Sequence, residues 1–69
     1  MTPLGLDLSE MTAASLLTAR RALGLRQDEL ARIVGYQRPG TISEMERGKA
    51  AVPRHVAVIV RLLMERRSR

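Results

Sequence analysis

"QDELARIVGYQRPGTISEMERGK", residues 27–49, places two short helical patterns on either side of a turn. The first pattern, over 27–34, repeats apolar residues at helical spacing: Leu30, Ala31 and Val34. Gly35 follows and predicts the end of this helix, because glycine tolerates the left-handed backbone that often closes one. The second pattern lies within 39–47 and carries many charged and hydrogen-bonding side chains, which a helix that only fills a core does not need.

The second helix has two competing start signals. Pro39 suits the first helical position, with Arg38 before it held extended. Alternatively, Thr41 caps the helix and Glu44, three residues on, completes a capping box. The same apolar side chains face the core from either start: Ile42 and Met45.

Two further helices are expected outside this stretch. The first spans about 12–23 and is capped by Thr12, unless Asp7 provides an earlier cap. The last begins at Pro53 and runs to about Arg66. Its predicted buried stripe is Val56, Ile59, Val60 and Leu63.

These patterns predict an all-α protein, a compact bundle of four to five short helices, with no strand signal. We divide the chain into an N-terminal arm over 1–11, a helical domain over 12–66 and a basic C-terminal tail over 67–69. A chain of 69 residues is near the lower size limit for a domain that folds alone.

Charge indicates the class of partner. The net charge is +5, and all twelve basic residues lie from Arg20 onward, which favours a polyanionic partner such as nucleic acid. No basic segment followed by a long apolar run is visible at the start, and no apolar stretch reaches the roughly 20 residues that span a bilayer. We therefore expect a cytoplasmic protein that does not enter the membrane.

Catalytic and metal-binding signals are weak. The chain has no cysteine, and His55 is its only histidine, without a cluster of carboxylates nearby in the sequence. No glycine-rich phosphate loop is present. We expect no enzyme activity, no metal, no cofactor and no small-molecule effector.

Two helices joined by a short turn are the layout of a helix-turn-helix, whose second helix enters the DNA major groove. The residues resemble the Cro/CI-type helix-turn-helix family, the lambda repressor-like (XRE) domains of phage and bacterial regulators. The matching positions are Arg20, Leu23-Gly24-Leu25, Gln27, Glu29-Leu30-Ala31, Gly35, Ile42-Ser43 and Glu46-Arg47-Gly48-Lys49. Two departures stand out: Arg26 occupies the place of a capping Ser or Thr, and the turn over 35–41 is one residue longer, which leaves the register of base contacts open.

The resemblance implies a sequence-specific transcriptional regulator that binds double-stranded DNA. Its simplest form is a small homodimeric repressor on an inverted repeat, such as the autorepressor of a phage, mobile-element or anti-CRISPR-associated operon. One alternative is an antitoxin-like module that binds a partner protein. Another is a non-specific, nucleoid-like DNA binder, against which Thr41 and Glu44 on the reading helix argue.

The candidate DNA contacts fall into three groups. Base-edge candidates lie on or just before the second helix: Arg38, Gly40, Thr41 and Glu44. Arg38 suits guanine and Glu44 suits cytosine, unless the capping box uses Glu44 and Thr41. Turn residues touch base or phosphate, or only pack within the turn: Tyr36 and Gln37. Phosphate candidates, which are otherwise solvated charged or polar side chains, are Gln27, Arg47, Lys49 and Arg54.

Two sets of residues have expected structural roles. The resemblance implies that Glu46 pairs with Arg20 across two helices and fixes the second helix of the motif. Dimer contacts are expected on the last helix, which has more apolar surface than one stripe needs: Val58, Leu62 and Met64. The alternative is that the N-terminal arm covers these three side chains within one chain.

Overall fold

The computed structural model describes residues 11–67. Four helices follow one another in this range: α1 (Ala13–Ala22), α2 (Gln27–Val34), α3 (Pro39–Glu46) and α4 (Arg54–Arg67). No strand occurs among these residues, and the predicted all-α class is confirmed. The predicted arm, except Met11, lies outside the described residues, as do the alternative cap Asp7 and the last two residues of the predicted tail.

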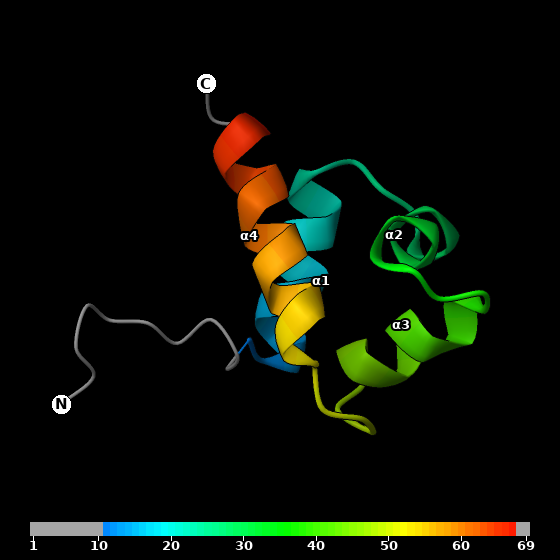
Figure 1. Cartoon of the computed structure of the whole chain (residues 1–69). Helices are drawn as coiled ribbons and strands as arrows, with labels where there is room; N and C mark the ends of the chain where they lie inside the picture. Colours follow the sequence, from blue (N-terminus) through cyan, green and yellow to red (C-terminus); the bar gives the residue numbers. More distant parts are fainter. Residues whose placement is uncertain (1–10, 68–69) are drawn as a thin grey trace, which may run out of the picture.

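The four helices form two halves that share one core (Figure 1). α1 and α4 lie side by side, while α2 and α3 pack against each other and contact α1 and α4. The core holds side chains from all four helices and from the loop before α4: Leu16, Ala19, Leu30, Ala31, Val34, Ile42, Met45, Val52, Val56 and Val60. All of them are aliphatic or methionine, as expected of a chain whose only aromatic residue is a tyrosine.

The ends of α1 and α2 follow the local sequence signals. The Thr12 hydroxyl accepts a hydrogen bond from the Ser15 backbone N–H at 3.0 Å, so the predicted cap forms. α2 ends at Gly35, whose φ of 96° lies in the left-handed region. At the start of α2, the backbone N–H of Arg26 donates to the Glu29 carboxylate at 2.7 Å, which supplies one half of a capping box although Arg26 cannot accept.

α3 begins at Pro39, so the first of its two predicted starts is the one formed. Arg38 precedes it with an extended backbone, φ −118° and ψ 130°, which is the conformation favoured before proline. Thr41 then lies inside the first turn, where its side chain is past the capping position. The capping box between Thr41 and Glu44 is therefore not formed, and neither side chain is used in that way.

The buried stripe of α4 differs from the prediction. Val56 and Val60 are buried as expected, but Ala57 is the third buried residue, while Ile59 and Leu63 are only half-buried. The small side chain at position 57 suits close approach to neighbouring helices, because the distance between packed helices depends on the side chains at the contact. No helix within 11–67, α4 included, has the length and apolar character to cross a membrane.

Candidate nucleic-acid interface

α2 and α3 are joined by residues 35–38 and pack directly on each other, which is the helix-turn-helix geometry. The turn is fixed by the Tyr36 backbone N–H, which donates to the Ala31 carbonyl at 2.8 Å. On the inner side of α3, Ile42 is 0% and Met45 2% exposed. These two side chains anchor the helix, and its opposite side faces away from the core.

A partly buried ion pair ties the end of α3 to α1. Arg20 Nε donates to Glu46 Oε2 at 2.5 Å, and Arg20 Nη2 donates to Oε1 at 3.1 Å. The side chains are only 12% and 5% exposed. A further bond, from Arg20 Nη1 to the Leu25 carbonyl at 2.9 Å, holds the loop between α1 and α2. The expected contact between Arg20 and Glu46 is therefore present and bidentate, the geometry that gives such pairs their specificity.

Gln27 joins the same network from the start of α2. Its side-chain Nε2 donates to Glu46 Oε1 at 3.0 Å. The residue predicted as a phosphate contact thus also links α2 to the end of α3. The amide nitrogen carries two hydrogens, so one donor remains for another acceptor. Sequence reasoning missed this bond, because nothing local signals a contact between residues 19 positions apart.

The network also sets the ionisation of Glu46. Burial alone would raise the pKa of this carboxyl group, but hydrogen bonds from Arg20 and Gln27, with the charges of Arg20 and Arg21, outweigh that effect. The pKa is held below its usual value of 4.5. Glu46 is therefore a carboxylate at neutral pH, as a partner of Arg20 must be.

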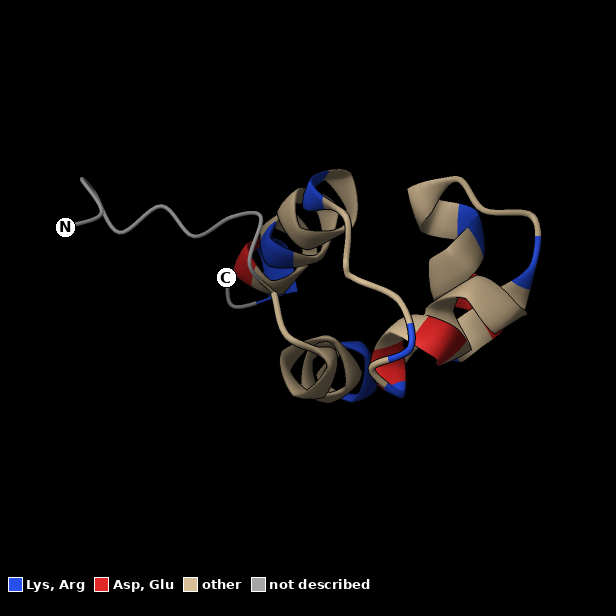
Figure 2. Cartoon of the chain, turned by 90° about the horizontal axis from the view of Figure 1, so that it is seen from below, with Lys and Arg blue, Asp and Glu red and all other residues tan. Residues whose placement is uncertain are grey.

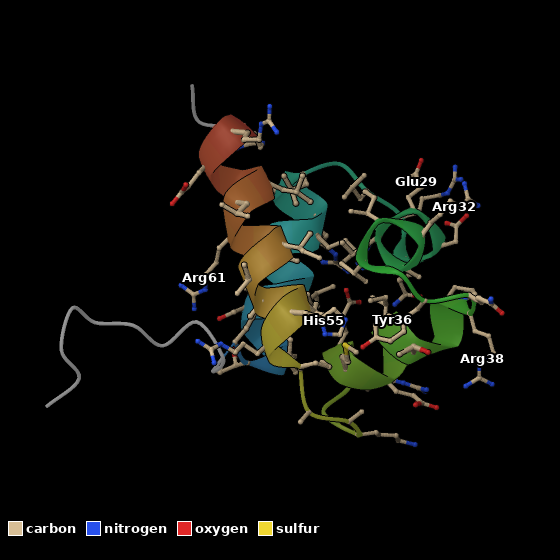
Figure 3. All side chains as sticks on the ribbon, in the orientation of Figure 1. Glu29, Arg32, Tyr36, Arg38, His55 and Arg61 are labelled. Carbon is tan, nitrogen blue, oxygen red and sulfur yellow. The ribbon has the colours of Figure 1, made fainter. Side chains whose placement is uncertain are left out.

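The outer side of α3 contrasts with this network. Gln37, Arg38, Gly40 and Glu44 are exposed, and Thr41 is half-buried. Within residues 11–67, the side chains of Arg38 and Glu44 make no hydrogen bond or ion pair. Figure 3 shows Arg38 pointing away from the body of the protein at the start of α3. These side chains are available to an external partner.

Basic side chains flank α3 along the chain. Arg38 precedes the helix, Arg47 and Lys49 follow it, and Arg54 is the first residue of α4; all four are exposed. Figure 2 shows the basic residues on the segments that enter and leave α3, with acidic residues on the helix between them. This arrangement suits a partner that carries negative charge on both sides of a less charged strip.

Tyr36 takes a different place from the other turn residues. Its ring packs against the core and lies 5.7 Å from the His55 ring, centroid to centroid, with the planes tilted by 59°. Figure 3 shows the two side chains directed toward one another, from the turn and from α4. The Tyr36 ring therefore packs within the protein, which is one of the two alternatives expected for this residue. Its contact with His55 was not predicted. No group of three His, Cys, Asp or Glu side chains in residues 11–67 could hold a metal ion.

The residues expected at a dimer contact lie together at a different surface. Val58, Leu62 and Met64 line a groove of about 480 Å³ beside α1, together with Met11 and Ala19. Leu62 is 53% exposed and lies next to the other apolar side chains of the groove, so this surface is an apolar patch rather than a single exposed leucine. The groove belongs to the half of the fold made by α1 and α4, whereas α3 belongs to the other half (Figure 1).

Comparison with known proteins agrees with this geometry. The sequence model of a family described as helix-turn-helix matches residues 16–60, more than half of the chain, from within α1 to the middle of α4. The matched range contains the whole of α2, the turn and α3. Searches of curated proteins and of solved structures found no match to the chain.

Proposed function

Because the chain belongs to the XRE-type, lambda repressor-like helix-turn-helix family, we propose that it is a sequence-specific regulator of transcription that reads base pairs with the outer side of α3. The family is one of DNA-binding regulators and is not typically enzymatic. The proposal therefore concerns which residues meet the DNA, in which assembly, and with what effect.

One observation carries the proposal: the two sides of α3 differ in what occupies them. The inner side is fully used by the core and by the bonds of Glu46. On the outer side, Arg38 and Glu44 are exposed and have no side-chain partner within 11–67. A recognition helix needs this combination, because it must be held rigidly while its outer side chains remain free to meet base edges.

Base reading is assigned to Arg38, just before α3, and to the outer side of the helix. Arg38 matches guanine, whose O6 and N7 accept both arms of a guanidinium, and Glu44 accepts from cytosine N4. Each good contact of this kind gives about 1–3 kcal/mol of discrimination against a wrong base. Thr41 and Gly40 complete the reading surface, and Gln37 lies beside it in the turn.

Phosphate binding is assigned to the flanking residues. Arg47, Lys49 and Arg54 follow α3 and are exposed, as expected of side chains that meet the sugar-phosphate backbone. Gln27 contributes its remaining amide hydrogen at the start of α2, where the helix dipole also favours a phosphate. The Tyr36 hydroxyl is an additional candidate, while its ring packs inside the protein.

We further propose that two copies bind an inverted repeat and repress by occupying a promoter, most simply that of the protein's own operon. One recognition helix covers few base pairs, and a two-fold dimer doubles the site, with half-sites about 34 Å apart. The exposed Leu62 and its neighbours Val58 and Met64 supply the dimer contact. We place such a regulator in the cytoplasm.

Selection of binding sites from a random duplex pool at physiological salt tests the proposal. We expect enrichment of an inverted repeat whose half-sites are one helical turn apart. If no sequence is enriched, and binding disappears steeply as salt rises, the protein is a non-specific binder and the assignment of base reading is wrong.

The dimer contact can be tested at two large apolar side chains that are exposed within residues 11–67. Leu62 on α4 is 53% and Ile33 on α2 is 46% exposed. We expect Leu62→Glu to convert a dimer to a monomer in analytical ultracentrifugation and to weaken operator binding. Ile33→Glu, the matched control, should leave both unchanged. A monomeric wild type, or equal effects of the two substitutions, would contradict the assignment of this surface.

The groove beside Leu62 also favours a second candidate, a module whose main partner is another protein. That function predicts that substitutions at Arg38 and Arg47 have little effect on binding of the partner protein. Substitutions of the residues that line the groove should abolish that binding. The site selection separates the two candidates, because only the regulator enriches a DNA sequence.

A further inference from the structure

Gly40 differs from the other glycines of residues 11–67. Gly24, Gly35 and Gly48 have φ angles of 73°, 96° and 77°, in the left-handed region that side chains other than glycine rarely adopt. Each of them lies just after a helix. Gly40 lies inside α3 and does not have a positive φ, so its backbone conformation does not require glycine.

Packing does not require glycine at position 40 either. An ideal Cβ built there has no heavy atom within 4 Å, and the residue is exposed. Glycine is a poor helix former and alanine the best, so the fold by itself would favour alanine. The part of the chain that the structure describes therefore shows no structural requirement for glycine at this position.

The position of Gly40 on α3 suggests why a glycine is present there. Residues four apart lie on the same side of a helix, so Gly40 and Glu44 share the side opposite the buried Ile42 and Met45. Gly40 is also in the first turn, two residues after Arg38. In the proposed binding mode, this N-terminal part of the helix comes closest to the base pairs.

We propose that Gly40 sets the depth at which α3 enters the major groove and is thereby a specificity-determining residue. This inference rests on the proposed function. Without a side chain at position 40, the helix backbone comes into van der Waals contact with a base-pair edge. Arg38 and Glu44, on either side, then reach their own base edges at hydrogen-bonding distance. A side chain at position 40 would hold the helix away from the groove floor and lengthen both contacts.

The same substitution, glycine to alanine, at positions 40 and 24 tests the inference. Gly40→Ala is predicted to raise the melting temperature by about 2–8 °C, because its backbone conformation suits alanine. It should weaken binding to the selected operator duplex by roughly tenfold or more, the effect of losing one good base contact. Gly40→Leu should weaken binding further.

Gly24→Ala is the matched control. Gly24 also has open space around an ideal Cβ, but its φ is 73°, so alanine is strained there. This variant should melt at a lower temperature, yet bind the operator like the wild type at a temperature where it is folded. Alanine at position 40 should thus raise the melting temperature and weaken DNA binding. Alanine at position 24 should lower the melting temperature and leave DNA binding unchanged.

The outcomes are distinct. If Gly40→Ala binds the operator as tightly as the wild type, or melts at a lower temperature, the inference is wrong while the proposed function stands. If the wild type itself selects no DNA sequence, the proposed function fails and this inference fails with it.

Discussion

Glu44 and Glu46 are the same residue type on the same short helix, and the fold uses them in opposite ways. Glu46 is 5% exposed in its side chain and accepts hydrogen bonds from Arg20 and Gln27. Glu44 is exposed and its side chain has no partner within residues 11–67. Two positions along a helix correspond to about 200° of rotation, so one carboxylate faces the protein and the other faces outward.

The two carboxylates mark the two sides of α3: an inner side that the fold uses, and an outer side that we propose for DNA recognition. Its inner side joins three helices through one buried carboxylate and two apolar side chains, so its position is fixed by the fold. On its outer side, Glu44 is exposed and its side chain has no hydrogen bond or ion pair within residues 11–67. Substitutions on the inner side should therefore change the stability of the protein, and substitutions on the outer side should change its DNA binding.

The largest effect is expected from Glu46→Ala. Removing this carboxylate leaves the guanidinium of Arg20, whose side chain is 12% exposed, without its anionic partner. Breaking a fully buried pair costs about 3–5 kcal/mol, so we expect a loss near the lower end of that range for this partly buried one. That is a large share of the stability of a domain this small. Urea denaturation measures the loss. Glu44→Ala is the matched control and should change the free energy of unfolding by less than about 0.5 kcal/mol. Similar losses for the two variants would show that α3 is not divided in this way.

Acid should weaken the inner side of α3 in a defined direction. The pKa of Glu46 is lowered from 4.5 in the folded protein, so its contribution to stability is fully present above pH 4.5 and is lost as the pH falls through the lowered pKa. We expect the difference in unfolding free energy between wild type and Glu46→Gln to shrink below pH 4.5. Denaturation curves across that range measure it, and a difference independent of pH would contradict the cause given for the shift.

The smallest effect is expected at the edge of the outer side. Lys49→Ala removes an exposed charge assigned to a phosphate, so binding should weaken about equally for all DNA sequences. The slope of log affinity against log salt should fall by about 1. Titrations at several salt concentrations measure the slope. A loss confined to the selected operator would instead place Lys49 among the base-reading residues.

Much of the fold could be predicted because its signals are local. Gly35 after Val34 and the proline at 39 each act on neighbouring backbone, and the bounds of α2 were predicted as observed. The start of α3 could not be decided, because Pro39 and the Thr41–Glu44 box are both valid local signals and only the folded turn selects one. The burial of Ala57 in place of Ile59 depends on how closely α4 approaches its neighbours, which no spacing in the sequence records.

The site was predictable to a similar degree. The pairing of Arg20 with Glu46 followed from a resemblance, and the outward position of Glu44 from the helical spacing of Ile42 and Met45. The bond from Gln27 to Glu46 and the ring contact between Tyr36 and His55 were missed. Both join residues from different elements, so they exist only once the helices have packed.

The most direct test of the account is the site selection repeated with Arg38→Ala beside the wild type, with Arg32→Ala as the control. Arg32 is also an exposed arginine, but it lies near the end of α2 rather than at the start of α3. We expect Arg38→Ala to lose the base preference at one position of each half-site, by about 1–3 kcal/mol, and to keep the base preferences at the other positions. Arg32→Ala should keep them all. An unchanged preference in the Arg38 variant, or a uniform loss at every position, would contradict base reading by the outer side of α3.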